Sequence, residues 1–226
     1  MNTSVRITGL SKSFEAATGP VPVFDGLSLA LTAGESLALT GPSGSGKSTL
    51  LNILCGLEQA TAGGLSVLGH DRDTLSADRW AGLRRRRIGV VFQDSNLMPA
   101  MTLGENVKLR ADLAGRPFGT VGDWLSRLGL AGLEDRYPDQ VSGGQRQRAA
   151  LAMVFAMGPD LVLADEPTGS LDRHTARDVA DALFRWQQAQ ACSLILATHD
   201  LALADRCDRH LDLAQATGAP AAPEDA

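Results

Sequence analysis

The segment SLALTGPSGSGKSTLLNILCGL, residues 36–57, runs from an apolar stretch through a glycine-rich loop into a helical pattern. Residues 36–40 predict a buried strand, and residues 47–57 predict the helix that follows it. Strand–loop–helix units of this kind build α/β folds with a parallel sheet. Three further apolar runs, each ending at polar residues, predict more buried strands: 88–92, 161–164 and 193–198. We therefore expect a parallel sheet with its chemistry at the carboxyl ends of the strands.

The rest of the chain divides into smaller units around this sheet. The first 35 residues and GGLSVLG (63–69) predict short strands and turns, which we interpret as an antiparallel β edge subdomain. Residues 94–158 are mostly helical in pattern and predict an inserted α-helical subdomain between two core strands. We expect one domain over residues 1–213 and, because AQATGAPAAPEDA has no apolar pattern, a disordered tail over residues 214–226.

Composition and charge exclude several classes of protein. The net charge of the 226 residues is −5, whereas a general binder of nucleic acid carries a basic excess, so we expect no nucleic-acid partner. The basic run RRRR (84–87) is interpreted as a solvated helix end. The three cysteines show no metal-ligand spacing, and their odd number argues against a disulfide framework and favours a reducing compartment. Cys55 is predicted to be a core residue.

Membrane insertion is not predicted for this chain. The first residues, MNTSVRITGL, lack the apolar core of a signal peptide. No uninterrupted apolar stretch approaches the ~18 residues that a membrane-spanning helix needs. If the protein works at a membrane, we expect another chain to bring it there.

The glycine-rich loop matches the pattern G-x-x-x-x-G-K-[ST] in full over residues 41–48. Its glycines let backbone N–H groups surround phosphate oxygens, and the helix that follows directs its positive end at them. Lys47 is predicted to reach the β- and γ-phosphates, and the Ser48 hydroxyl to ligate Mg²⁺. Lysine occurs only three times among 21 basic residues, which fits a need for a compact point charge at position 47. The predicted nucleotide-binding residues here are Gly41, Ser43, Gly44, Ser45, Gly46, Lys47, Ser48 and Thr49.

The nucleotide base is predicted to be adenine. Guanine-specific proteins with such a loop carry an Asn-Lys-x-Asp motif, and this sequence has none. Phe14, in SKSFE, is the candidate for stacking on the base, with packing inside the antiparallel edge as the alternative. ATP and Mg²⁺ are therefore the predicted cofactors.

Polar residues end three of the predicted strands. In LVLADEP (161–167), Asp165 is predicted to hold Mg²⁺ directly or through water, and Glu166 to act on the attacking water as general base. Gln93, which closes IGVVFQ, could reach Mg²⁺ or that water, and His199, which closes SLILATH, could hydrogen-bond the γ-phosphate. The catalytic candidates are thus Glu166, His199 and Gln93, and the metal ligands Ser48, Gln93 and Asp165.

A second glycine motif, VSGGQ (141–145), begins a long helical run inside the helical subdomain. Ser142, Gly143, Gly144 and Gln145 would present a second positive helix end to phosphate. One chain could hardly fold both cradles onto one phosphate group, but two chains arranged head to tail could. We therefore predict a two-fold dimer of this chain with ATP between the copies.

The order and spacing of these motifs resemble the nucleotide-binding subunits of ABC transporters over residues 1–213. The resemblance also covers a D-loop, SLD (170–172). It implies a P-loop NTPase core and an ATPase that dimerises with a second copy and drives a membrane permease through a coupling helix seated near Gln93. It further implies a cytoplasmic protein, held peripherally on the inner face of the cell membrane by that partner.

A narrower resemblance is to the lipoprotein-releasing and macrolide-exporter branch, carried by NLMPAMTLGENV (96–107), YPDQVSGG and LADEPTGSLD. It implies a permease with few transmembrane helices and a large extracytoplasmic domain. Three residues depart from the family pattern: Val141 replaces Leu, Arg146 stands where Gln or Lys is common, and Met153 replaces Arg. The resemblance gives no account of Met153.

Two other functions fit the same motifs. One is an ABC ATPase without transport, such as an iron–sulfur assembly factor; the long coiled coils of repair members and the fused cassettes of translation members are not in this sequence. The other is a mechanical signaller whose ATPase cycle activates a cell-wall hydrolase beyond the membrane. The ATPase chain would look alike in each, and the difference would lie in the partner.

Overall fold

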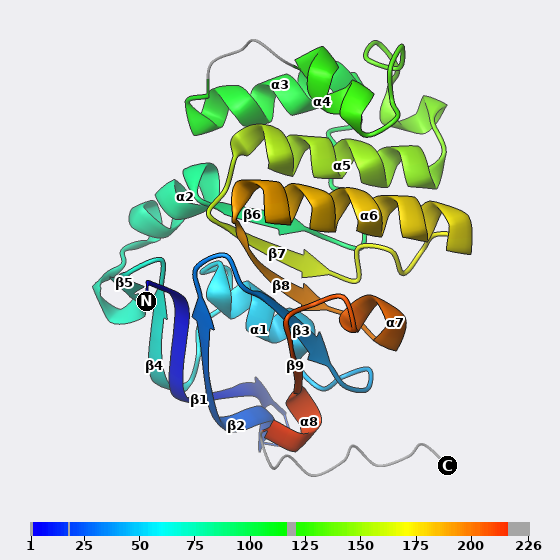
Figure 1. Cartoon of the computed structure of the whole chain (residues 1–226). Coiled ribbons are helices and arrows are strands. Elements are labelled where there is room, and N and C mark those ends of the chain that lie inside the picture. The colour runs from blue at the N-terminus through cyan, green and yellow to red at the C-terminus, as the bar shows by residue number, and fades with distance from the viewer. Residues whose placement is uncertain (1, 18, 117–120, 217–226) are drawn as a thin grey trace.

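The computed structural model describes residues 2–17, 19–116 and 121–216, and its core is a parallel sheet with helices on both faces (Figure 1). The strand order is β6-β7-β8-β3-β9, and each neighbouring pair is parallel. The strands are β3 Ser36–Thr40, β6 Ile88–Val91, β7 Leu161–Asp165, β8 Ser193–Ala197 and β9 Arg209–Asp212. The four strands predicted from apolar runs are confirmed. Edge strand β9 was missed because its sequence, RHLD, is mostly polar.

Alternate residues of the parallel strands enter two separate apolar clusters, because side chains of a strand point to opposite faces in turn. In β7, Leu161 and Leu163 pack with α1 and the antiparallel sheet, whereas Val162 and Ala164 pack with the helical side of the molecule. Both faces of the sheet are therefore covered by apolar side chains. This explains why its strands read as continuous apolar runs rather than as alternating ones.

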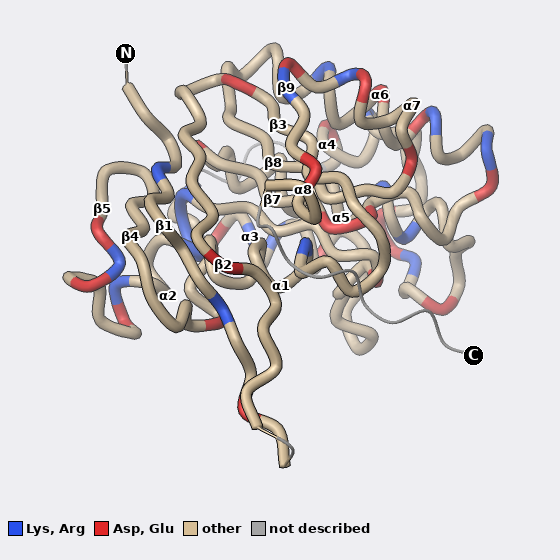
Figure 2. The backbone as a smooth tube through the Cα atoms, turned by 90° about the horizontal axis from the view of Figure 1, so that it is seen from below, with Lys and Arg blue, Asp and Glu red and all other residues tan. Residues whose placement is uncertain are grey.

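The antiparallel part is a separate four-stranded sheet with the order β2-β1-β4-β5. Its strands are β1 Thr3–Ala16, β2 Gly19–Thr32, β4 Ala62–Val67 and β5 His70–Asp71. The sheet lies where the sequence predicted an antiparallel subdomain, but β1 and β2 have 14 residues each and are longer than expected. Their hairpin projects from the body of the molecule (Figure 2).

Eight α-helices lie in the described part of the chain. They are α1 Lys47–Leu54, α2 Ala77–Arg86, α3 Leu103–Ala114, α4 Val121–Arg127, α5 Gly143–Met157, α6 Arg173–Gln190, α7 Leu201–Ala204 and α8 Leu213–Ala216. Helices α3 to α5 occupy the segment between β6 and β7, where the helical insertion was predicted, and α5 and α6 lie side by side (Figure 1). Helix α8 takes up the start of the segment expected to be a disordered tail, and residues 217–226 lie outside the described residues.

The basic run at the end of α2 is only partly solvated, so its interpretation as a solvated helix end was incomplete. Arg85 and Arg86 are exposed. Arg84, by contrast, donates to the backbone carbonyls of Cys55 and Gly56 at 2.9 and 3.1 Å, and Arg87 forms an ion pair with Asp160. Half of the run therefore ties α2 to the neighbouring loops.

The cysteines are structural, as the position of Cys55 in an apolar run had predicted. Cys55, Cys192 and Cys207 are free thiols and all are buried. Burial, together with the nearby charge of Asp160, raises the pKa of the Cys192 thiol to about 12, so little reactive thiolate forms near neutral pH. Among the described residues, no helix has the length and apolar character of a membrane span.

The N-terminal ends of α5 and α6 approach each other closely at Gly144. A Cβ atom added there would lie 2.2 Å from Cγ2 of Thr175. We predict that Gly144→Ala lowers the free energy of unfolding by about 1–3 kcal/mol, because overpacking forces the two helices apart. Urea unfolding followed by circular dichroism measures this loss.

The second change Thr175→Ser removes Cγ2 and leaves the nearest Thr175 atom 3.4 Å from the new Cβ. The double variant is therefore expected to regain most of the lost stability. Gly144→Ala with wild-type stability would contradict close packing of the two helices at this point.

Candidate functional site

A pocket of about 680 Å³ opens where the parallel strands end and α1 begins. It gathers residues from β1, β2, the glycine-rich loop, α1 and the ends of β6, β7 and β8. The lining residues are Phe14, Val23, Ser43, Gly44, Gly46, Lys47, Ser48, Thr49, Gln93, Asp165, Glu166 and His199. Among the candidates for one nucleotide, only Gly41 and Ser45 lie outside this lining, and both belong to the same loop. Val23 was not predicted, because an isolated valine in a strand carries no functional signal.

The glycine-rich loop adopts a conformation that side chains would prevent. Gly41, Gly44 and Gly46 have φ values of 135°, 81° and 92°, which L-residues rarely adopt. At Gly46 a Cβ atom would also lie 2.5 Å from Cγ1 of Val23, so β2 presses directly on the loop. One side of the loop therefore packs against β2, and its other side faces the pocket.

Lys47 is already placed for a phosphate. Its side chain is buried, and Nζ donates to the carbonyls of Gly41 at 2.8 Å and Pro42 at 3.0 Å. An ammonium has three N–H donors, so one donor remains beyond these two bonds. Ser45 Oγ is buried and has no hydrogen-bond partner among the described residues. A cradle of backbone N–H groups, a spare ammonium donor and an unpaired hydroxyl fit a bound phosphate chain.

Glu166 and His199 are in direct contact, which the sequence did not predict. One oxygen of Glu166, Oε1, lies 2.8 Å from Nδ1 of His199 and accepts from the backbone N–H of His199 at 3.0 Å. Thr198 Oγ1 donates to the other oxygen at 3.3 Å. The carboxylate is mostly buried, whereas the imidazole is 72 % exposed. These bonds hold one face of Glu166 and leave the residue at the pocket wall.

The backbone at Glu166 is strained. Its φ is +44°, a left-handed conformation that a residue with a Cβ adopts at a cost of about 1–3 kcal/mol. The chain therefore leaves β7 in a sharp turn after Asp165, and the carboxylates of Asp165 and Glu166 can point in different directions. A backbone N–H···O bond from Glu166 to Ala197 ties this turn to β8.

Phe14 lies on the projecting hairpin, lines the pocket and is 41 % exposed, so part of its side chain is open to solvent. Nζ of Lys12 lies 4.2 Å from the centroid of the Phe14 ring. The same ammonium donates to Glu58 at 2.8 Å and to the carbonyl of Gln59 at 2.9 Å, and this bond holds the pKa of Glu58 below its usual value. No role was predicted for Lys12, although lysine is rare in this chain and the same rarity supported the role of Lys47.

The second glycine motif lies apart from this pocket. Within the described chain, none of residues 142–145 lines it. Ser142 Oγ accepts from the N–H of Gln145, and Gln145 Oε1 accepts from the N–H of Ser142 at 2.8 Å, so the pair caps α5. Arg146 donates to the carbonyls of Pro138 and Val141, which braces the loop before the cap. The exposed start of α5 is a positive helix end that lies outside this pocket.

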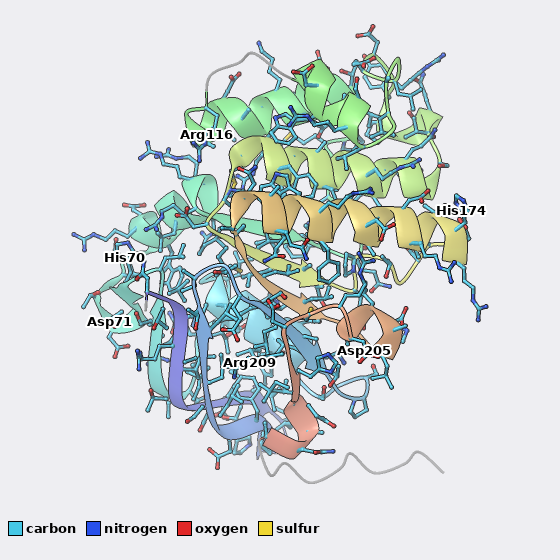
Figure 3. The ribbon with its side chains drawn as sticks, viewed as in Figure 1. His70, Asp71, Arg116, His174, Asp205 and Arg209 are labelled. Atoms are coloured by element: carbon cyan, nitrogen blue, oxygen red, sulfur yellow. The ribbon has the colours of Figure 1, made fainter. Side chains whose placement is uncertain are left out.

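Two of the other histidines lie far from each other. His70, on β5, and His174, on α6, occupy opposite margins of the molecule (Figure 3). Neither lines the pocket, and His174 pairs with Asp178 on its own helix. The structure therefore leaves His199 as the histidine of this site within the described residues.

Comparison with known proteins agrees with the geometry. Residues 24–169 match the family described as ABC transporter. The chain is 44% identical to the lipoprotein-releasing system ATP-binding protein LolD of Anaeromyxobacter dehalogenans, over 93% of this chain and 90% of that protein. It is 42% identical to the uncharacterized ABC transporter ATP-binding protein YbbA of Escherichia coli K12, over 92% and 93% of the two chains.

A solved structure shares the fold. It is a dimeric, post-hydrolysis state of the ATP-binding cassette MJ0796 bound to ADP and Pi, with a TM-score of 0.84 and 30% identity. The match covers 92% of this chain and 94% of that one. On this sequence identity, fold and pocket, the chain belongs to the ABC transporter ATP-binding family, and it binds ATP with Mg²⁺ and hydrolyses the ATP.

Proposed function

We propose that this chain works as a head-to-tail dimer around two Mg-ATP and drives a partner permease in the membrane. The observation that carries the proposal is that the two phosphate cradles of one chain are separate. The pocket is lined by residues 43, 44 and 46–49 of the glycine-rich loop with Asp165 and Glu166, whereas residues 142–145 lie outside it. A second copy that presents its α5 end to this pocket would complete the site. The dimeric state of MJ0796 supports this arrangement.

In each site, Lys47 and the backbone N–H groups of residues 41–49 neutralise and orient the phosphate chain. Ser48, Asp165 and Gln93 are the residues that would hold Mg²⁺, which when bound offsets the negative charge at the β- and γ-phosphates. Glu166 takes the proton of the attacking water as its oxygen approaches the γ-phosphate. The hydrogen bonds from Thr198 and His199 orient this carboxylate. Phe14 stacks on adenine at the outer end of the pocket.

The permease is proposed to dock at a groove beside β6. This groove, of about 360 Å³, is lined largely by apolar side chains, and Met98, Leu57 and Leu113 at its rim are about half exposed. It also includes Phe92, the residue before Gln93. A coupling helix seated here would sense the position of Gln93. Met153 lines the groove where the family usually has Arg, and its flexible thioether suits an apolar partner surface.

The kind of permease is proposed from the relatives. LolD is named as part of a lipoprotein-releasing system. By analogy, we propose a partner with few transmembrane helices and a large extracytoplasmic domain, used for export, lipoprotein extraction or mechanotransmission. The ATPase would then sit on the cytoplasmic face of the membrane through this partner.

Glu166→Gln tests the general base. The amide keeps the size, its oxygen can still accept from the backbone N–H of His199, and its NH2 group can donate to Thr198 Oγ1, but it cannot take a proton from water. We predict that kcat for ATP hydrolysis falls about 10²- to 10⁴-fold while ATP binding is kept. Phosphate release measures kcat. Asp123→Asn, the same change of charge on exposed residue 123 of α4, is the control and should leave kcat unchanged. Normal turnover by Glu166→Gln would sink the assignment.

Changes at the two cradles should separate binding from dimerisation. In the Glu166→Gln background, Lys47→Ala is expected to lose both ATP affinity and the ATP-induced dimer. Ser142→Ala is expected to keep ATP binding by the monomer and lose the dimer, as measured by light scattering with Mg-ATP. Ser142→Asp keeps a side-chain cap for α5 but opposes phosphate with like charge, so it should behave as Ser142→Ala does. A stable dimer of Ser142→Asp would contradict the head-to-tail arrangement.

A partner can be captured by the trapped dimer. Tagged Glu166→Gln protein with Mg-ATP, added to detergent-solubilised membranes of its own host, is expected to recover a polytopic protein with a large extracytoplasmic domain. Mass spectrometry identifies the recovered protein. Lys47→Ala, which is expected to lose ATP affinity, is the matched control. Recovery of soluble proteins alone would instead favour an ABC ATPase without transport.

A further inference from the structure

Gln147 is a buried polar residue of α5 to which the proposed chemistry gives no role. Its side chain is 2 % exposed, and Nε2 donates to the backbone carbonyl of Phe92 at 3.0 Å. Phe92 directly precedes Gln93, whose side chain lines the nucleotide pocket. Gln147 therefore ties α5 to the segment that carries Gln93.

The position of this hydrogen bond along α5 matters. Gln147 is one helical turn beyond Gly143, and α5 begins at the Ser142 cap. Farther along, α5 packs directly on β6, because a Cβ atom at Gly89 would lie 2.5 Å from Cγ1 of Val154. The contacts between α5 and the β6 segment thus include a tight apolar contact far from the cap, and near the cap the bond of Gln147 to Phe92, just after β6.

These two contacts differ in what they can transmit. The contact at Gly89 is close enough to exclude a Cβ atom, so it holds α5 against β6 at that point. The hydrogen bond from Gln147 lies nearer to the cap, where a small shift of Phe92 would move the start of α5. This bond is part-buried, and a carbonyl that loses its donor in such a place is costly, so Gln147 and Phe92 are expected to move together.

We propose that Gln147 is a positioning residue that couples the two nucleotide sites of the dimer. Its bond to Phe92 links the placement of Gln93 at one nucleotide to the placement of Ser142 and Gly144 of the same chain at the other nucleotide. The coupling is reciprocal, because an affinity change passed from one site to the other must pass back equally. This inference rests on the head-to-tail dimer of the proposed function.

Gln147→Met tests the proposal, because it keeps the length and removes the donor. Gln187→Met is the matched control. Gln187 is buried on α6, and its Nε2 donates to the carbonyls of Gly34 and Cys192 at 2.9 Å, but neither of these residues lines the nucleotide pocket. Gln147→Met loses one amide–carbonyl bond and Gln187→Met loses two, and only the bond of Gln147 leads to the segment of Gln93.

The readouts are the dimer dissociation constant with Mg-ATP in the Glu166→Gln background, and the Hill coefficient of ATP hydrolysis with Glu166 intact. Gln147→Met is expected to weaken the dimer roughly tenfold and to lower the Hill coefficient toward one. ATP affinity of the monomer should stay within about twofold. Gln187→Met should change neither readout, although it lowers the unfolding temperature.

A double-mutant cycle with Gln93→Ala separates coupling from packing. If Gln147 acts through Gln93, Gln147→Met should weaken the dimer less than about twofold when Gln93 is already Ala. Undiminished, additive effects would overturn the proposal and leave Gln147 as a packing residue. Should Gln147→Met fail to fold, Gln147→Asn, whose shorter amide falls out of reach of Phe92, replaces it in the cycle.

The dimer and the coupling through Gln147 are distinguished by different outcomes. If the Glu166→Gln protein does not dimerise with Mg-ATP, the proposed function fails and takes the coupling with it. If it dimerises and the cycle is additive, the dimer stands and the role of Gln147 is overturned.

Discussion

The site depends first on how tightly β2 and the glycine-rich loop pack together. Val23 lies where a Cβ atom of Gly46 would have to be, so the loop can turn only one way. The backbone donors and the Lys47 ammonium therefore lie on the side that faces the pocket. The carbonyls of Gly41 and Pro42 accept hydrogen bonds from the ammonium. The cost of ordering these donors is met when the chain folds rather than when phosphate binds, which is the basis of pre-organisation.

The parallel sheet then supplies the remaining residues of the site. Because all its strands run in one direction, their carboxyl ends meet at one edge, and the polar residue after each apolar run reaches the same pocket. This is why Gln93, Asp165 and Glu166 could be predicted from the sequence. Each interrupts an apolar run abruptly, and an abrupt change of this kind is visible without coordinates. Strand β9, with the sequence RHLD, has no such contrast and was missed.

What the sequence could not predict are contacts between residues far apart in the chain. The bond between Glu166 and His199 depends on a left-handed backbone turn that no residue type announces, since only glycine favours it. The hydrogen bond of Lys12 to Glu58 joins residues 46 positions apart, one on β1 and the other in the loop after α1. Distances of this kind arise from tertiary packing, whereas motifs record only residue type and spacing.

Tertiary packing also gives a contact to Gln147, a residue to which the motifs assigned no role. In VSGGQRQR, the first glutamine, Gln145, looks like the functional one, yet its side chain closes the cap of its own helix. The second, Gln147, faces inward and reaches Phe92 across the interface between α5 and β6. A cap needs only to hold the helix end, but a dimeric site also needs that end to respond to the nucleotide in the same chain. We propose that the buried amide of Gln147, bonded to the backbone beside Gln93, meets this need. It connects the two cradles at a point that does not line the nucleotide pocket.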